Sequence, residues 1–188
     1  MAHLTHTRLI AIALVTFVVG AVAAAVAVGQ QASRANAGKL LQVEGEVTVN
    51  GAAATSGATV FSDSTMTTAA RSSAVVSLGK LGRVEVLPSS TMKLSFSDPN
   101  VSVAMLDAGR VRISSSSGVN ASVNTRDGNI RTTGNQRNEF IVDTSCGNTF
   151  VSVKKGTVDL RTGDDVRQVP AGGQDTAGTA RPGCTPAP

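Results

Sequence analysis

Aromatic residues are almost absent from this sequence: its 188 residues include five Phe, no Trp and no Tyr. A core must therefore be built from Val, Leu, Ile and Ala, which suits a thin β-architecture better than a thick globule. Enzymes that act on polysaccharides usually hold sugar rings on aromatic faces. A carboxylate-dependent enzyme of that kind, using loop acids such as Asp127, Glu139, Asp164 and Asp165, therefore ranks last among the functions we consider.

Histidine is equally scarce, because His3 and His6 are the only two and both precede a long apolar stretch. The chain beyond that stretch therefore lacks the residues for Ser-His-Asp catalysis, Cys-His catalysis or histidine-ligated zinc. It also lacks the spacing of an acidic calcium loop and a Gly-rich phosphate loop. We expect a protein that is not an enzyme, with no metal, no cofactor and no small-molecule substrate.

Charge is sparse at 16% of residues, and the net charge is +4. From Gly38 onward, 15 basic residues stand against 13 acidic ones, and the longest basic run is Lys154-Lys155. A nucleic-acid interface needs a dense basic face with aromatic residues that stack on bases. We therefore expect no nucleic-acid partner.

The stretch Leu9–Val28 carries no charge, and at ~1.5 Å rise per residue it spans about the 30 Å hydrocarbon core of a bilayer. Its length favours an uncleaved transmembrane helix, with residues 1–8 as a short cytoplasmic N-terminus and the rest outside. We expect a single-pass protein of the cytoplasmic (inner) membrane with its C-terminal domain outside the cytoplasm. The alternative is the apolar region of a signal peptide cleaved near Ala37, which follows Ala35-Asn36 and would leave a secreted or periplasmic protein.

The segment Asn138–Leu160 alternates apolar and polar residues and is interrupted by the turn signals Cys146-Gly147-Asn148 and Lys155-Gly156, a pattern typical of half-buried β-strands. Its last run reads Gly-x-Val-x-Leu, and related phrases occur earlier in the chain. We expect most copies to be the return half of a β-hairpin. The copies begin at Gly45, Gly82, Gly109, Gly128 and Gly156.

These patterns predict an all-β domain, a stack of short hairpins arranged as a solenoid or a sandwich, over residues 39–174. Residues 29–38 form a small, polar linker, and residues 175–188, rich in Gly, Ala, Thr and Pro, are expected to be a disordered tail. The serine run Ser114–Gly118 is expected to be flexible. That run and the loop Thr132–Asn138 are the places where we expect contacts with a partner.

Two interpretations fit the charged residues inside the Gly-x-Val phrases. In the structural one, paired strands bring Glu85 near Arg112 and Arg131 near Asp159 on the solvent face. In the functional one, arginines form a basic stripe that meets an anionic envelope polymer, with two residues of the Thr132–Asn138 loop nearby. The candidate surface is Arg83, Arg110, Arg112, Arg131, Asn135 and Arg137.

Cys146 and Cys184 are the only cysteines, and both follow the apolar stretch. A disulfide is the default in an oxidising compartment, and here it would pin the C-terminal tail to the domain. A free thiol and an intermolecular bond are the alternatives.

Five short phrases of turn and strand follow one another along the chain: Val43–Gly51, Leu87–Leu94, Leu106–Val111, Val153–Val158 and Val169–Gln174. In this order they give the chain a resemblance to the FecR domain family of bacterial envelope proteins over about Leu40–Gln174. A departure occurs near Gly134, where Thr133 replaces the arginine of the family's V-R-G-T-x-F phrase and extra residues precede Phe140.

The resemblance implies an extracytoplasmic β-domain that binds a protein or polymer of the cell envelope. The best-known FecR proteins connect an outer-membrane receptor to a cytoplasmic sigma factor through one membrane helix. About eight residues precede Leu9, too few for a folded segment that grips a sigma factor. We therefore expect a binding or signalling module without the sigma-regulator function, or alternatively a secreted structural or adhesive protein.

Overall fold

The computed structural model describes residues 36–186, and the predicted membrane segment Leu9–Val28 lies outside them. Within the described part, no helix is long and apolar enough to cross a membrane. The elements are β1 (Ala37–Glu44), β2 (Val47–Val49), β3 (Ala52–Ala53), β4 (Thr59–Phe61), β5 (Ser64–Thr68), β6 (Ser73–Ser77), the 3₁₀ turn η1 (Gly79–Leu81), β7 (Gly82–Val86), β8 (Ser90–Ser97), β9 (Asn100–Met105), β10 (Arg110–Ser115), β11 (Asn120–Asn124), β12 (Asn129–Thr132), β13 (Asn138–Asp143), β14 (Thr149–Lys155), β15 (Thr157–Thr162), β16 (Asp165–Pro170) and β17 (Gln174–Ala177).

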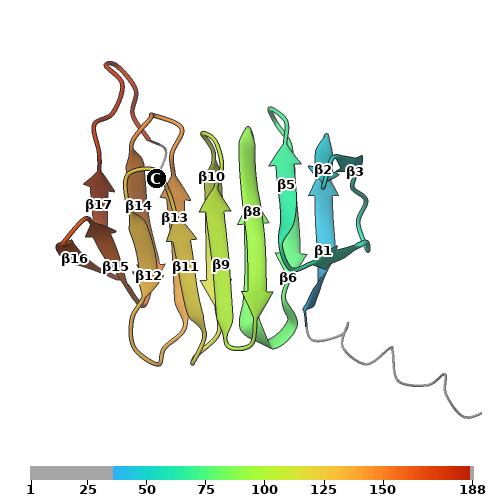
Figure 1. Cartoon of the computed structure of the whole chain (residues 1–188), viewed down its shortest axis with the longest axis horizontal. Coiled ribbons are helices and arrows are strands. Elements are labelled where there is room, and N and C mark those ends of the chain that lie inside the picture. The colour runs from blue at the N-terminus through green and yellow to red at the C-terminus, as the bar shows by residue number, and fades with distance from the viewer. Residues whose placement is uncertain (1–35, 187–188) are drawn as a thin grey trace, which may run out of the picture. The chain divides into compact units, whose positions relative to one another are not determined.

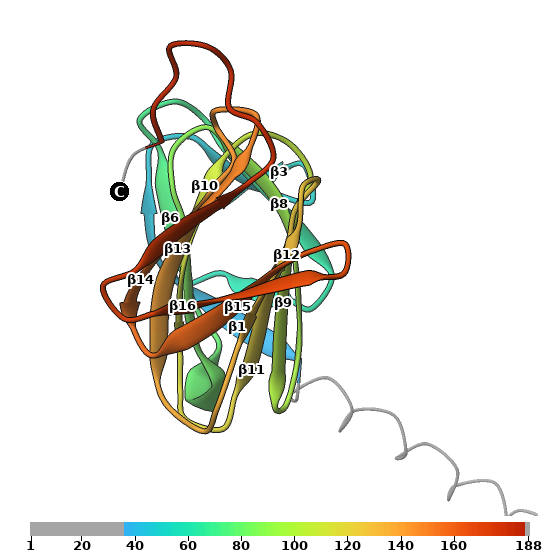
Figure 2. The same cartoon turned by 90° about the vertical axis from the view of Figure 1, so that its left-hand side faces the viewer.

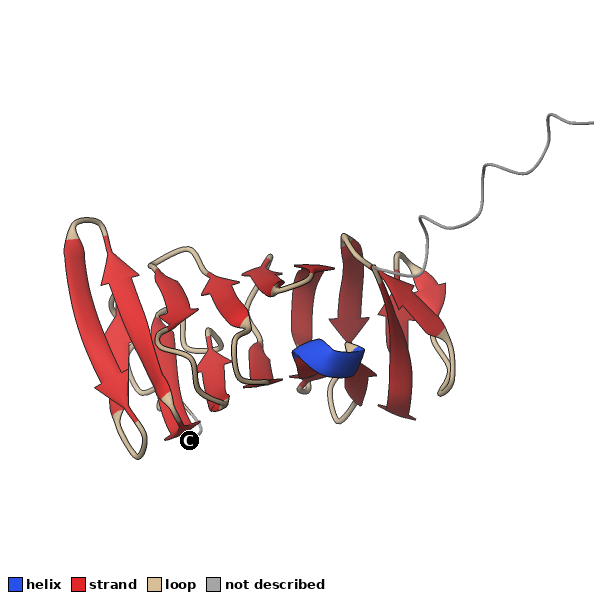
Figure 3. Ribbon diagram, turned by 90° about the horizontal axis from the view of Figure 1, so that it is seen from below, coloured by secondary structure: helices blue, strands red, loops and turns tan. Residues whose placement is uncertain are grey.

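The strands form two open sheets. Sheet A has eight strands in the order β17-β14-β13-β10-β7-β6-β1-β4, and sheet B has nine in the order β16-β15-β12-β11-β9-β8-β5-β2-β3. In both sheets the chain advances from one edge toward the other, from blue to red in Figure 1, as it does in a solenoid. Figure 2 shows the two sheets face to face. The all-β prediction is confirmed, and η1, blue in Figure 3, is the single helical turn between residues 36 and 186.

One apolar core fills the space between the sheets. Alternation along each strand supplies it, as in β8, where every second residue is buried. Phe140, Leu94 and Ile130 are among its largest fully buried side chains, and most of the others are Val. Each buried side chain of this size stabilises the fold by about 1.5–3 kcal/mol.

The Gly-x-Val phrases do not all close hairpins. Those at Gly82 and Gly128 do, since β6 pairs with β7 and β11 pairs with β12. The phrases at Gly45, Gly109 and Gly156 instead carry the chain between the sheets, because β1, β10 and β14 belong to sheet A while β2, β9 and β15 belong to sheet B. The hairpin prediction is wrong at these three glycines. Alternation shows which side chains face the core, but it does not show which strand lies alongside.

Each of the three glycines that connect the sheets packs against a buried polar side chain. A Cβ at any of them would overlap that side chain. The residue after the glycine donates its backbone N–H to the same side chain, so the corner is held by a hydrogen bond. These bonds are Glu46 N–H to Ser72 Oγ at 2.9 Å, Arg110 N–H to Ser90 Oγ at 2.7 Å, and Thr157 N–H to Asn138 Oδ1 at 3.1 Å.

One complete turn of the chain around the core is visible between β9 and β11. These strands lie side by side in sheet B and are the one parallel pair among the described strands, with β10 crossing to sheet A between them. Asn100 pairs with Asn120 and Ser102 with Ser122, so similar residues stand in register. The Asn120 side-chain amide donates to Asn100 Oδ1 at 3.2 Å. This segment is therefore built as a solenoid coil, and its strands β9 and β11 also belong to the hairpins β8–β9 and β11–β12.

Two predicted flexible regions are ordered. The first half of the serine run Ser114–Gly118 belongs to β10, and Ser115 is buried. The predicted tail begins inside β17, which pairs with β14 and buries Ala177. The first residues of the predicted tail therefore belong to sheet A, because β14 offers a free edge that the composition of residues 175–186 does not reveal.

Candidate binding site

The candidate basic stripe is divided between two faces. Arg83, Arg110 and Arg112 lie on β7 and β10 in sheet A, while Arg131 lies on β12 in sheet B. Their strand neighbours are buried, so all four side chains point away from the core, as alternation predicts. Because the outer faces of the two sheets point in opposite directions, the four arginines do not form one stripe.

The predicted cross-strand neighbours are correct. Glu85 and Arg112 are register partners, and Arg112 Nη1 lies 2.6 Å from Glu85 Oε2. Arg131 stands directly across from Asp159 in sheet B. Both pairs of neighbours are thus as the structural interpretation predicts, and Arg112 is held by a carboxylate of its own domain.

Asn135 and Arg137 lie exposed in the connection between β12 and β13. This loop contacts the end of the serine run, because the Ser117 hydroxyl donates to the Asn135 carbonyl at 2.9 Å. The two predicted contact regions therefore form one continuous edge of the domain. Ser114 is the register partner of Arg83, and Thr132 directly follows Arg131, so these two regions adjoin both arginine groups.

A small hollow of about 280 Å³ opens on the outer face of sheet A beside Arg112. Glu139 lines it and forms ion pairs with Lys154 at 3.2 Å and with Lys155 at 3.7 Å. The charged groups that line the hollow are thus paired with one another or with other residues of the domain. A ligand in the hollow would find few charged groups that are not already in an ion pair.

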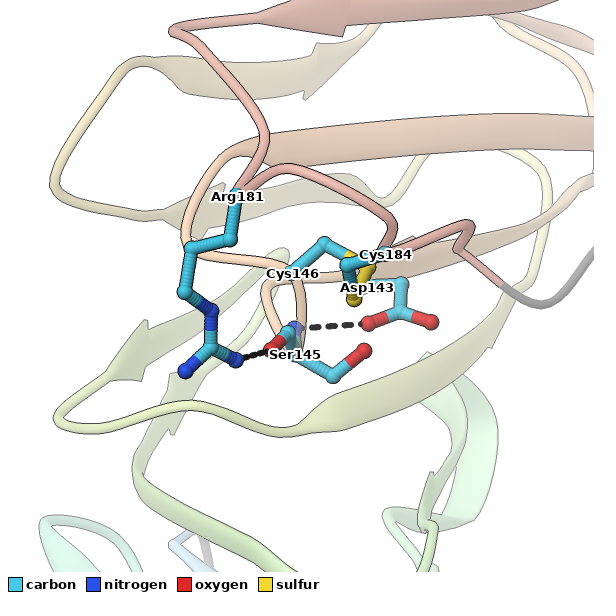
Figure 4. The surroundings of a disulfide bond; sticks show 5 residues. All are labelled: Asp143, Ser145, Cys146, Arg181 and Cys184. Atoms are coloured by element: carbon cyan, nitrogen blue, oxygen red, sulfur yellow. Dashed lines mark hydrogen bonds between the residues drawn. A yellow bond between two sulfur atoms is a disulfide. The ribbon is translucent and has the colours of Figure 1, made fainter.

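Cys146 and Cys184 form a disulfide with a Cα–Cα distance of 5.5 Å. Cys146 is buried in the turn between β13 and β14, and Cys184 lies in the segment after β17 (Figure 4). The Arg181 backbone N–H donates to the Cys146 carbonyl at 2.9 Å, and its guanidinium donates to the Ser145 carbonyl. The C-terminal segment is therefore fixed to this turn by one covalent bond and two hydrogen bonds.

A groove of about 500 Å³ lies at the same end of the domain. Four segments that are distant in the chain form it: the β9–β10 corner, the β11–β12 turn, the β13–β14 turn and the disulfide-bonded C-terminal segment. Sequence reasoning missed it because no pattern connects four separate turns; the cysteine pair was the one available signal. Residues that line it include Leu106, Asp107, Arg126, Asn148, Thr179 and Arg181.

The groove combines an apolar side chain with charged groups of both signs. Leu106 is 53% exposed and is one of four large apolar residues exposed in the described domain, with Leu41, Phe61 and Val166. Arg126 donates to the Gly147 carbonyl, and its Nε lies 3.4 Å from Asp127 Oδ1. Asp127 also accepts from the Thr149 hydroxyl at 3.4 Å. Between residues 36 and 186 no group of three His, Cys, Asp or Glu side chains is arranged to hold a metal ion.

No family model matches the chain, and no curated protein matches it. Two solved structures are similar to it, crystal structures at 2.50 and 1.65 Å resolution of a putative anti-sigma factor from Parabacteroides distasonis ATCC 8503. Each shares 19% sequence identity and a TM-score of 0.51, with 60% of this chain covered. The shared feature is the fold. The match covers 53% of the length of those proteins, so this chain spans about half of them.

Proposed function

We propose that this chain is a FecR-like binding and signalling module of the bacterial cell envelope, without enzymatic activity and tethered by Leu9–Val28. The Cys146–Cys184 disulfide carries the proposal. Disulfides persist in oxidising compartments and are rare in the bacterial cytoplasm, so the bond supports a domain outside the cytoplasm. The similarity in fold to an anti-sigma factor, and the order of the FecR-like phrases, support the signalling part.

The groove is the proposed binding site. The disulfide fixes one of its walls, and the guanidinium groups of Arg126 and Arg181 hold two carbonyls of the β13–β14 turn. A site with fixed walls loses little conformational entropy when a partner binds. Leu106 supplies an exposed apolar side chain, and covering it with a protein partner would remove apolar surface from water. This combination favours recognition of a protein over bond-breaking chemistry.

A second candidate function is a secreted structural or adhesive envelope protein. One observation favours it: β1 begins at Ala37, the residue of the predicted cleavage site. A chain cleaved there would start at Gly38, which is buried in β1, and would keep the rest of the domain. Such a protein would have no connection to the membrane.

Intact mass and membrane fractionation of the natively expressed protein distinguish the two candidates. A full-length, membrane-bound product supports the tethered module, and a soluble product that begins at Gly38 contradicts it. A photo-crosslinking residue placed at position 106 then tests the groove. The matched control is position 61, because Phe61 is 57% exposed at the other end of the domain. We expect an envelope protein to crosslink at position 106 and not at 61; equal crosslinking at both would contradict the groove.

A further inference from the structure

We infer that the free edge of β16 binds an extended segment of another protein by strand addition. This site goes beyond the proposed groove, since β16 contributes no residue to the groove lining. Each open sheet has two edge strands: β4 and β17 in sheet A, and β3 and β16 in sheet B. At the N-terminal end, β3 and β4 have two and three residues, too short to offer a ladder. β16 has six, more than any other edge strand of the described domain.

The position of Pro170 shows which backbone groups of β16 are free. Pro170 is the register partner of Thr157 on β15, and it has no N–H, so this pair cannot be one that exchanges two hydrogen bonds. Hydrogen-bonded and non-hydrogen-bonded pairs alternate in an antiparallel ladder. The bonded pairs are therefore those of Val169, Arg167 and Asp165. Val166 and Gln168 consequently direct their N–H and C=O groups away from β15, toward the open edge.

Contacts on the core-facing side of β16 hold this edge strand in place. Arg167 lies in the middle of β16, and its guanidinium contacts Asp165 Oδ2 at 3.2 Å, Asp175 Oδ1 at 2.7 Å and the Thr176 carbonyl at 3.0 Å. These contacts connect β16 to β17 of the other sheet. A strand that is already fixed pays little entropy when a second strand pairs with it.

Natural edge strands are usually protected against pairing by lysine, proline or an inward charge. β16 contains no lysine, and its proline stands at its last position, beyond Val166 and Gln168. Its inward charge, Arg167, is paired with two carboxylates, so it offers an added strand no unpaired charge. The usual protection is therefore weak over Val166–Gln168.

The side chains beside the edge define the partner. Val166 faces outward and is 46% exposed, which favours an aliphatic residue opposite it. On the outer face of sheet B, the charges on the two strands beside β16 are Arg131, Asp159 and Arg161, a surplus of one positive charge, while Asp164 and Asp165 lie at the turn where β16 begins. The partner segment is therefore extended, aliphatic at alternate positions and acidic rather than basic between them.

Hydrogen exchange on the full-length protein in mild detergent tests the inference. The probes are short acetylated peptides that alternate valine with glutamate, compared with peptides that alternate valine with lysine. We expect the glutamate peptides to slow exchange of the Val166 and Gln168 amides and to leave the rates at Arg167 and Val169, which are already bonded to β15, unchanged. Protection of neither edge amide by any of these peptides would overturn the inference.

Two variants separate backbone pairing from side-chain contact. Gln168→Pro removes the outward N–H and leaves the bonded pairs of β16 intact, so peptide binding should weaken by about tenfold. Gln168→Ala keeps the N–H and should bind normally. The same peptide with N-methyl groups on its pairing edge should fail to bind the unchanged protein, which keeps the test valid if Gln168→Pro does not fold. Equal binding by the methylated peptide would overturn strand addition. If the edge amides instead became protected as the protein concentration rises and a dimer forms, the partner would be a second copy of this chain and the inference of a different partner protein would be overturned.

Discussion

Asn138 occupies the space that Gly156 leaves free. A Cβ at position 156 would overlap Asn138 Oδ1, and the same oxygen accepts the Thr157 N–H at 3.1 Å. Gly156 also has a φ of +79°, a left-handed conformation that disfavours any residue with a side chain. Two independent requirements therefore demand glycine where β14 of sheet A becomes β15 of sheet B.

Gly156→Ala should lower the free energy of unfolding by about 2–4 kcal/mol, since it combines left-handed strain with overpacking. Gly163→Ala is the matched control. Gly163 has a φ of +59°, but a Cβ there would meet nothing within 4 Å, so only the strain of about 1–2 kcal/mol remains. Urea unfolding of both variants measures the difference. Equal losses would show that contact with Asn138 contributes nothing.

The Arg112–Glu85 ion pair should contribute measurably to stability. Its side chains are 38% and 26% exposed, and the atoms lie 2.6 Å apart. Lys80 and Asp98 also lie 2.6 Å apart, but their side chains are 77% and 55% exposed. Double-mutant cycles should give a coupling of about 0.5–1 kcal/mol for the first pair and close to zero for the second. A larger coupling for the exposed pair would contradict the role given to burial.

Loss of the disulfide should loosen the C-terminal segment. The bond closes a loop with a sequence separation of 38, for which loop entropy predicts about 3–4 kcal/mol of stabilisation. The variant with both Cys146→Ala and Cys184→Ala should unfold at lower urea, and crosslinking at position 106 should fall. Reductant should have the same effect on the unchanged protein and none on the variant. A variant as stable as the unchanged protein would show that β17 alone holds the segment.

The pKa of the Asp63 carboxylate should lie below its ordinary value. Its Oδ1 accepts from the Ser95 hydroxyl at 2.8 Å and lies 3.4 Å from Lys93 Nζ, and the hydrogen bond followed by the lysine lowers the pKa of Asp63. A lowered folded-state pKa gives stability that is present above the unfolded pKa and is lost as pH falls through the folded one. Ser95→Ala should therefore raise the pKa of Asp63 toward its ordinary value in a carboxyl NMR titration. Ser102→Ala, across the ladder from Ser95, should leave it unchanged.

Local patterns in the sequence determined the strands and the direction of their side chains. Alternation in Met92–Phe96 and in Phe140–Val142 places these apolar residues in the core, as the structure does. The charged partners Glu85 and Arg112 were also predictable, because they stand at equivalent places in two Gly-x-Val phrases whose strands pair. Such features depend on periodicity and on near neighbours, both of which are written directly in the order of residues.

Tertiary structure decided which strand joins which sheet. The same Gly-x-Val phrase closes a hairpin at Gly82 and crosses between sheets at Gly109, where the buried Ser90 receives the N–H that follows the glycine. Arg131 was separated from Arg112 for the same reason, and the groove arose where four turns met. Strand pairing is a long-range choice set by the packing of the whole core, and alternation along a single strand is identical for either sheet.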